Sequence, residues 1–273
     1  MKSSTFNLTS PVKKAFSPFF LALLFWSLGS QSVFANPAAN RPAYFELKVY
    51  HIINKRQEAV IDSFLQWQYI PSMQAAGIND IGVFKPVGND TTADKRIYVF
   101  IPFKSLKQWE KIEKETTSSL KGGDGEYANA AYNRPAYSRV ETIFIKAFDD
   151  MTALAIPKFE GPKNERVYEL RSYEGASEKI FRNKVQMFNA GGEIKLFSRL
   201  NFNGIFYGEV VFGSKMPNLM YMTSFKNMQS REEHWKAFSS DSEWKKLSAM
   251  KEYQNNVSHI DIVFLRPTTY SGI

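Results

Sequence analysis

The sequence predicts an α+β protein built from two tandem copies of one βαββαβ unit. The segment Phe45–Tyr50 returns with little change as Tyr168–Tyr173, and the Phe-Lys-Ser-Leu of residues 103–106 returns as the Phe-Lys-Asn-Met of residues 225–228. The same order of strand-like and helix-like patterns follows each copy of the first motif. An internal repeat determines the architecture before any local pattern does, so the fold is expected to use one unit twice.

The first unit spans residues 44–147. Its four expected strands cover residues 44–51, 81–87, 96–103 and 140–145. Asn54 is the expected N-cap of a helix whose apolar stripe runs from Val60 to Trp67, and Pro71 should break or kink that helix. A second helix should begin at the capping box Ser105-x-x-Gln108.

The second unit spans residues 166–273 and repeats this pattern. Its expected strands cover residues 167–173, 204–212, 219–225 and 260–265. Ser177 should cap a first helix, and residues 193–200 should form a short inserted helix. Capping boxes at Ser230-x-x-Glu233 and Ser240-x-x-Glu243 should start the last helices.

The order βαββαβ is that of ferredoxin-like domains, whose antiparallel sheet has strand order 4-1-3-2 and carries both helices on one face. The other face of each sheet would be an exposed apolar patch if it stayed open. Two sheets in tandem can cover each other, so a barrel-type fold is expected. Residues 148–165, with two prolines and a glycine, read as the linker between the units.

The N-terminus has the pattern of a cleaved secretory signal peptide over residues 1–35. Lys13 and Lys14 precede a short apolar run, and Val33-Phe34-Ala35 offers a cleavage site after Ala35. The rival interpretation is a retained anchor, but the run is short for a span of about 20 residues. We therefore expect a secreted or periplasmic protein with no membrane contact after cleavage, and residues 36–43 as a polar lead-in.

Composition excludes several functional classes. The chain has no cysteine, so it forms no disulfide and uses no thiolate for catalysis or metal binding. The formal charge of +8 includes three lysines of the predicted signal, and the remaining surplus is spread along the chain. The sequence shows no basic block with interleaved aromatics, so we expect no nucleic-acid partner.

The repeated first strand places a carboxylate, a cation and a phenol on one face, because alternate residues of a strand share a face. Leu47 and Leu170 are expected to point to the helices, and the polar residues into the barrel. Acids on the last strands should pair with the cations there, Lys48 with Glu141 and Arg171 with Asp261. The candidate cavity residues are Glu46, Lys48, Tyr50, Glu169, Arg171, Tyr173, Tyr207, Tyr221, Arg231, His259 and Asp261.

Three interpretations of this polar set are open. The charges can neutralise one another and fix the register of the sheets, because unpaired buried charges are very costly. They can instead line a cavity that binds a small molecule. They can also shift one another's pKa values and take part in catalysis.

The three histidines do not show metal-ligand spacing. His51 should face away from Tyr50, and His234 lies in a helix. His259 opens the last strand on the face of Asp261, which makes it the histidine best placed to reach a cavity. We therefore expect no metal and no cofactor.

The second unit resembles the NIPSNAP family. The likeness rests on the motif of residues 168–173, on Pro217–Met222, on the spacing of Phe225, Met228, Arg231, Trp235 and Phe238, on Ser242–Lys245 and on Leu265–Ser271. The first unit resembles the family more weakly, since it keeps Glu-Leu-Lys-x-Tyr but has no arginine that matches Arg231.

This resemblance implies the fold of the dimeric α/β-barrel superfamily, which also contains small monooxygenases and haem enzymes. The NIPSNAP family implies no catalytic residues. We therefore expect an exported protein that binds a small ligand or a protein partner in or around the barrel, with a homodimer as an open alternative. Whether it is an enzyme stays open, with binding favoured over catalysis. The rival is a haem-dependent or cofactor-independent monooxygenase.

Overall fold

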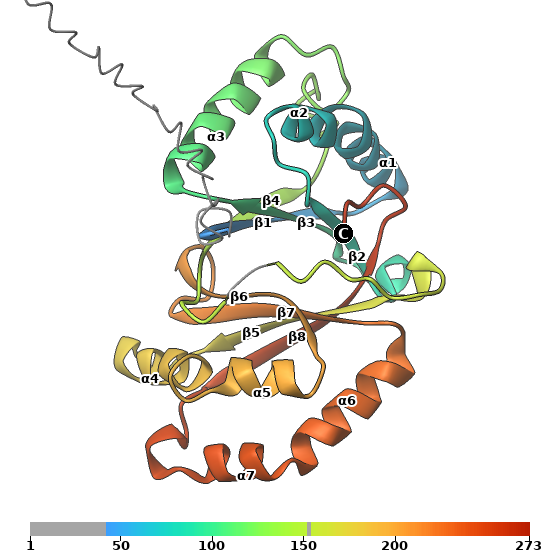
Figure 1. Cartoon of the computed structure of the whole chain (residues 1–273). Helices are drawn as coiled ribbons and strands as arrows, with labels where there is room; N and C mark the ends of the chain where they lie inside the picture. Colours follow the sequence, from blue (N-terminus) through green and yellow to red (C-terminus); the bar gives the residue numbers. More distant parts are fainter. Residues whose placement is uncertain (1–41, 152–153) are drawn as a thin grey trace, which may run out of the picture. The chain divides into compact units, whose positions relative to one another are not determined.

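Eight antiparallel strands close into a barrel in the computed structural model, which describes residues 42–151 and 154–273. The order around the barrel is β1-β3-β2-β8-β5-β7-β6-β4. Each half contributes four adjacent strands in the order 4-1-3-2, and the halves join where β2 pairs with β8 and β4 pairs with β6. The predicted α+β class and the closure of two ferredoxin-like sheets into a barrel are both confirmed (Figure 1).

The first half contains the strands β1 (Tyr44–Ile52), β2 (Gly82–Pro86), β3 (Lys95–Phe103) and β4 (Arg139–Ala147). Its helical elements are α1 (Lys55–Phe64), the π-helical turn η2 (Leu65–Tyr69), α2 (Ile70–Ala75), the 3₁₀ turn η3 (Asn89–Thr91) and α3 (Leu106–Lys121). Pro71 lies in the first turn of α2, directly after the π-helical turn. The predicted break is therefore a local change of helix type, because proline removes a backbone donor without ending the helix.

The second half contains β5 (Val167–Glu174), β6 (Asn203–Phe212), β7 (Asn218–Phe225) and β8 (His259–Pro267). Its helical elements are α4 (Glu178–Phe188), α5 (Glu193–Arg199), α6 (Met228–Ser240), α7 (Ser242–Ala249) and the 3₁₀ turns η4 (Lys163–Glu165) and η5 (Lys251–Tyr253). The inserted helix that the sequence predicted is α5.

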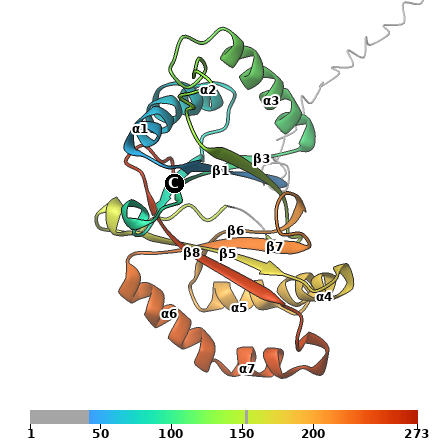
Figure 2. The same cartoon turned by 180° about the vertical axis from the view of Figure 1, so that it is seen from behind.

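Helices cover the outer face of each half of the barrel. Figures 1 and 2 show α1, α2 and α3 over the strands of the first half and α4 to α7 over those of the second. The C-terminal tail crosses to the first half, where the Gly272 amide donates to the Ile81 carbonyl and the Ser271 hydroxyl accepts from the Val83 amide. The tail therefore adds a contact between the halves beside the pairing of β2 with β8.

Side-chain caps start most helices where the sequence predicted them. Asn54, Ser105 and Ser177 each accept a hydrogen bond from the backbone amide three residues ahead. Two predicted caps are wrong. Asn227 caps α6 in place of Ser230, and Asp241 caps α7 in place of Ser240.

The barrel interior is filled with aromatic side chains at one end. Phe45, Phe100 and Phe206 pack on one another with ring centroids 5.1 to 5.3 Å apart. Phe84 packs on Tyr168 from the opposite half at 4.7 Å. These contacts between the two sheets close one end of the barrel and leave the other end to form a cavity.

The predicted signal peptide, residues 1–35, lies outside the described residues, so export stays a prediction. Among the residues that the structure describes, no helix combines the length and apolar character that a membrane span requires.

Candidate functional site at the barrel mouth

The ends of six strands surround a cavity of about 110 Å³ at one end of the barrel. Strands β1 and β5 finish there, and β3, β4, β7 and β8 begin there, because neighbouring strands are antiparallel. Both halves of the chain therefore contribute to one site, which we call the barrel mouth.

The floor of the cavity is apolar. It is made by inward-facing residues of six strands, which are Leu47, Val49, Tyr98, Ile143, Leu170, Met220 and Val263. The rim is polar and carries both signs of charge, through His51, Arg96, Glu141, Ser172, Ser214, Lys215, Asn218 and Asp261. An apolar floor below a few convergent polar groups is the usual composition of a small-molecule pocket.

His51 lies at the rim with both ring nitrogens engaged. Its Nδ1 is 2.7 Å from Asp94 Oδ1, and its Nε2 is 3.1 Å from Glu141 Oε1. Arg139 Nη2 lies 3.2 Å from the same Nε2. Nε2 can therefore donate to Glu141 when the ring is protonated and accept from Arg139 when it is neutral.

Asp94 holds His51 and Arg96 together. Its Oδ2 accepts hydrogen bonds from Arg96 Nε at 2.9 Å and Nη2 at 2.7 Å. Burial opposes ionisation of this carboxyl, but the bonds from His51 and Arg96 outweigh it and lower the pKa of Asp94. The carboxylate is thus charged at neutral pH and orients the imidazole.

Asn218 and Ser172 supply neutral polar groups to the other half of the rim. Asn218 Nδ2 donates to Ser172 Oγ at 2.8 Å, and the Asn218 side chain is almost fully buried. Its Oδ1 has no hydrogen-bond partner among the described residues. An unpaired buried acceptor is costly, so it favours a ligand or water that donates a hydrogen bond.

Most of the predicted cavity residues lie elsewhere, between the sheets and the helices. In the first half Glu46 Oε2 accepts from Trp109 Nε1 of α3 at 3.1 Å, and Lys48 lies 2.5 Å from Glu46 and 3.4 Å from Glu113. Tyr50 Oη is 3.3 Å from Tyr127 Oη. The predicted inward orientation of these residues is wrong, because it is Leu47 that lines the cavity.

The second half repeats this arrangement under α4, α5 and α6. The Glu169 carboxylate forms ion pairs with Arg171 at 2.5 Å and with Arg231 Nε at 2.8 Å, and it accepts a hydrogen bond from Trp235 Nε1 at 2.8 Å. Arg171 Nη1 donates to Tyr173 Oη at 3.0 Å, which bonds to Tyr221 Oη at 2.8 Å.

Tyr207 packs against Tyr221 in this layer, with ring centroids 5.7 Å apart. Leu170, and not Arg171, faces the barrel. Of the eleven predicted cavity residues only Asp261 lines the cavity, and His259 stands beside it, largely exposed. A binding role for the other nine stays a prediction.

The charged residues of β1 and β5 point to the helices, and not into the barrel as predicted, because the helices carry the partners for these charges. The barrel interior is sealed by the opposite sheet and offers mostly apolar side chains. The helices offer an indole N–H and a carboxylate to β1, and an indole N–H and a guanidinium to β5. A buried charge is tolerated only beside such partners.

The predicted ion pairs are wrong for the same reason. Lys48 pairs in register with Thr142, and Glu141 with Val49, while Arg171 pairs with Ile262.

Sequence reasoning missed His51, Asp94, Arg96, Lys215 and Asn218. The sequence places His51 correctly on the face opposite Tyr50, but that face looks into the barrel and not toward the helices. The sequence does contain a clue to the correct orientation, because the predicted helix after Ser105 carries Trp109 and Glu113. These polar partners favour a position of Glu46 and Lys48 under α3.

The second half of the chain is NIPSNAP-like. The family model described as NIPSNAP matches residues 168–272, which confirms the resemblance of the second unit and leaves the first unit outside the match. No curated protein sequence matches the chain.

Solved structures match most of the chain. A protein from Fusobacterium nucleatum, described as a "putative monooxygenase", is 8% identical over 84% of this chain and 93% of its own, with a TM-score of 0.54. A protein of the same description from Lactobacillus acidophilus is 9% identical over 83% of this chain and 94% of its own, with a TM-score of 0.53.

A NIPSNAP-like domain protein from Burkholderia xenovorans is 18% identical over 40% of this chain and 90% of its own, with a TM-score of 0.36. At the identities of the two larger matches, the likeness establishes the dimeric α/β-barrel fold and no activity.

Proposed function

We propose that this protein binds a small organic molecule at the barrel mouth, with an apolar part on the floor and a polar group at the rim. The observation that carries the proposal is the contrast between the two surfaces. Leu170 and Val263 stand on the apolar floor, and the unpaired Asn218 Oδ1 belongs to the rim. The apolar part would gain from burial, and the polar group would satisfy a buried acceptor.

The cavity volume limits the size of the enclosed part. An engineered apolar cavity of about 150 Å³ holds one benzene molecule, and this cavity measures about 110 Å³. The enclosed part is therefore smaller than, or about the size of, one ring, and the remainder of a larger ligand would extend past His51 and Lys215 into solvent.

Two neighbouring residues of β8 provide the test. Val263 faces the cavity, whereas Ile262 points to the other face of the strand and is 43% exposed. Phenol, a ring with one hydrogen-bond donor, serves as the probe in amide NMR titrations. We expect it to shift the amides around the cavity in the parent protein and in Ile262→Phe, but not in Val263→Phe, where the new ring fills the site.

Phenol binding to Val263→Phe as strong as to the parent would place the ligand elsewhere and refute the proposal. If phenol binds as expected, native mass spectrometry of the parent protein purified from its own host would identify the class of the natural ligand.

A cofactor-independent monooxygenase is the second candidate. It needs a largely apolar cavity with few polar groups, and the floor of the barrel mouth meets that condition. Oxygen uptake with hydroquinone as the probe, lost in Val263→Phe and kept in Ile262→Phe, would favour this candidate over simple binding.

The described residues do not fit a haem. A haem bound through histidine requires an imidazole nitrogen free for the iron, and both nitrogens of His51 are engaged. His234 Nδ1 bonds to the Ser230 carbonyl, and its ring packs on Phe202 and Phe225. His259 lies at the edge of a cavity of about 110 Å³, which is too small for a porphyrin.

A further inference from the structure

The barrel mouth carries the same three-residue arrangement twice, once in each half. His51 pairs in register with Arg139, and Glu174 pairs with His259. Ser138 and Ser258, which precede these partners, donate to the carbonyls of His51 and Glu174 respectively. The set His51, Arg139 and Glu141 of the first half is therefore equivalent to the set Glu174, His259 and Asp261 of the second.

The first set contains its own cation. Arg139 Nη2 lies 2.7 Å from Glu141 Oε1 and 3.2 Å from His51 Nε2, so a guanidinium contacts both other side chains, which also lie 3.1 Å from each other. With a neutral imidazole, the formal charges of this set cancel.

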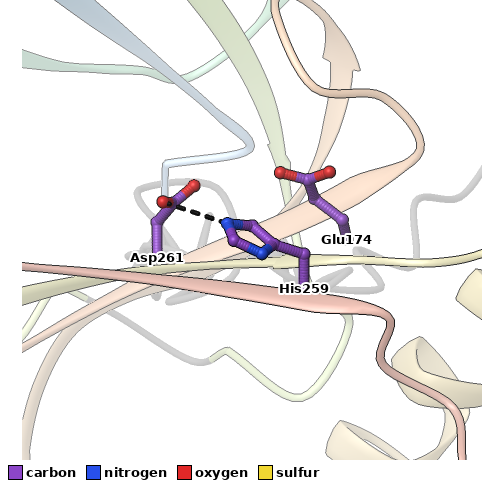
Figure 3. A group of neighbouring side chains, drawn as sticks. All are labelled: Glu174, His259 and Asp261. Carbon is purple, nitrogen blue, oxygen red and sulfur yellow. Dashed lines mark hydrogen bonds and ion pairs between the residues drawn. The ribbon is translucent and has the colours of Figure 1, made fainter.

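The second set replaces that guanidinium with an imidazole. Figure 3 shows the side chains of Glu174, His259 and Asp261 on one side of β5 and β8, with His259 Nε2 3.3 Å from Asp261 Oδ1. One ligand atom from each residue lies within 4.8 Å of the other two. Two carboxylates and a neutral imidazole carry a formal charge of −2, where the first set carries none.

We propose that Glu174, His259 and Asp261 bind a divalent transition-metal ion at the barrel mouth. The ion supplies the positive charge that the Arg139 guanidinium supplies in the first half. One imidazole nitrogen and two carboxylate oxygens suit Zn²⁺, Mn²⁺ or Fe²⁺ better than Mg²⁺ or Ca²⁺, which prefer oxygen ligands only.

The geometry needs only a small closure. Zn²⁺ binds such ligands at about 2.0–2.2 Å, which sets tetrahedral ligand atoms about 3.3–3.6 Å apart. Closing from the present arrangement is within reach of side-chain rotation, because His259 is largely exposed and Glu174 and Asp261 are only partly buried.

The other groups that face the site act in opposite directions. Asn218 pairs in register with Glu174 and offers a neutral amide. Lys215, from the connection between β6 and β7, makes an ion pair with Asp261 and competes with a metal ion for that carboxylate. Removing the Lys215 charge should therefore tighten metal binding, which a purely structural role of the three residues would not produce.

Zn²⁺ titration of the purified, tag-free protein by isothermal calorimetry tests the site, with Co²⁺ absorption as a direct report of nitrogen ligation. Losing one of three ligands in Glu174→Gln or His259→Ala should weaken Zn²⁺ binding by about tenfold or more. Lys215→Met should strengthen it. Asp80→Asn, which removes an exposed carboxylate just before β2, at the end of the barrel opposite the mouth, is the control for charge and should bind like the parent.

Two results would overturn the proposal. Either the parent shows no Zn²⁺ binding beyond that of Glu174→Gln, or His259→Ala binds Zn²⁺ and colours with Co²⁺ as the parent does. The outcome is independent of phenol binding on the apolar floor, so failure of one proposal leaves the other intact.

Discussion

Glu46 and Glu169 hold the same position in the two copies of the unit, yet their carboxyl groups have opposite environments. Both are fully buried. Burial raises the pKa of Glu46, and the single cation Lys48 does not offset it, since Glu113 adds a further negative charge. Burial also disfavours ionised Glu169, but hydrogen bonds and charges from Arg231 and Arg171 outweigh it and lower the pKa.

This contrast predicts opposite pH effects of two matched substitutions. The pKa of Glu169 is depressed in the folded state. Its contribution to the free energy of unfolding is therefore present above the unfolded pKa and is lost as pH falls through the folded pKa. The pKa of Glu46 is raised, so its contribution is present below the unfolded pKa and is lost as pH rises through the folded value.

At neutral pH Glu169→Gln should lower the free energy of unfolding by about 3 kcal/mol, because it leaves two arginines beside a neutral group. Glu46→Gln should change stability by less than about 1 kcal/mol and become more favourable as pH rises. Urea unfolding of both variants and the parent at several pH values between about 4 and 7 measures this. Parallel pH dependence of the two variants would contradict the assigned charges.

At the scale of single elements, helix starts show how a sequence signal can point to the wrong residue. Ser230-x-x-Glu233 has the spacing of a capping box, but Asn227 takes the cap because β7 ends at Phe225 and leaves the chain extended at residue 227. Asn227 Oδ1 accepts from the Ser230 amide at 2.9 Å. A motif gives a set of candidate caps, and the end of the preceding strand selects among them.

We therefore expect Asn227→Ala to cost about 1 kcal/mol through the loss of an N-cap. Ser230→Ala should stay within about 0.5 kcal/mol of the parent, as is usual for a surface change away from such features. Thermal or urea unfolding of the two variants compares them directly. A larger loss in Ser230→Ala than in Asn227→Ala would restore the capping box that the sequence suggested.

At the scale of the whole barrel, each half depends on the other for burial of its inner face. The second half presents Tyr168, Leu170 and Phe206 to the first, and its edge strands β6 and β8 pair with β4 and β2. Alone, this half would expose an apolar sheet face and two unpaired strand edges.

Residues 166–273 expressed alone should accordingly form dimers or larger assemblies, since self-pairing is the available way to cover that face. Light scattering after size-exclusion chromatography measures the mass, with residues 36–273 as the control. A monomeric fragment that unfolds cooperatively would show that closure of the barrel is not needed for folding.

The sequence by itself determined the duplication, the eight strands, their order and closure of the barrel, because a repeat and period-two alternation are local properties of the chain. It also determined that Glu46, Lys48 and Tyr50 share a face, as do their counterparts from Glu169 to Tyr173. Alternation alone does not say which of two buried faces looks inward.

Only the tertiary structure decided that question, because both faces of each strand are covered and the choice depends on partners distant in sequence. Trp109, Arg231 and Trp235 bind the carboxylates of Glu46 and Glu169 on the helix side of the strands. The neighbouring Leu47 and Leu170 therefore face the barrel and form the apolar floor. The same packing brings His51, Asn218 and Asp261 together at one mouth, where residues from six separate strands and both copies form the candidate site.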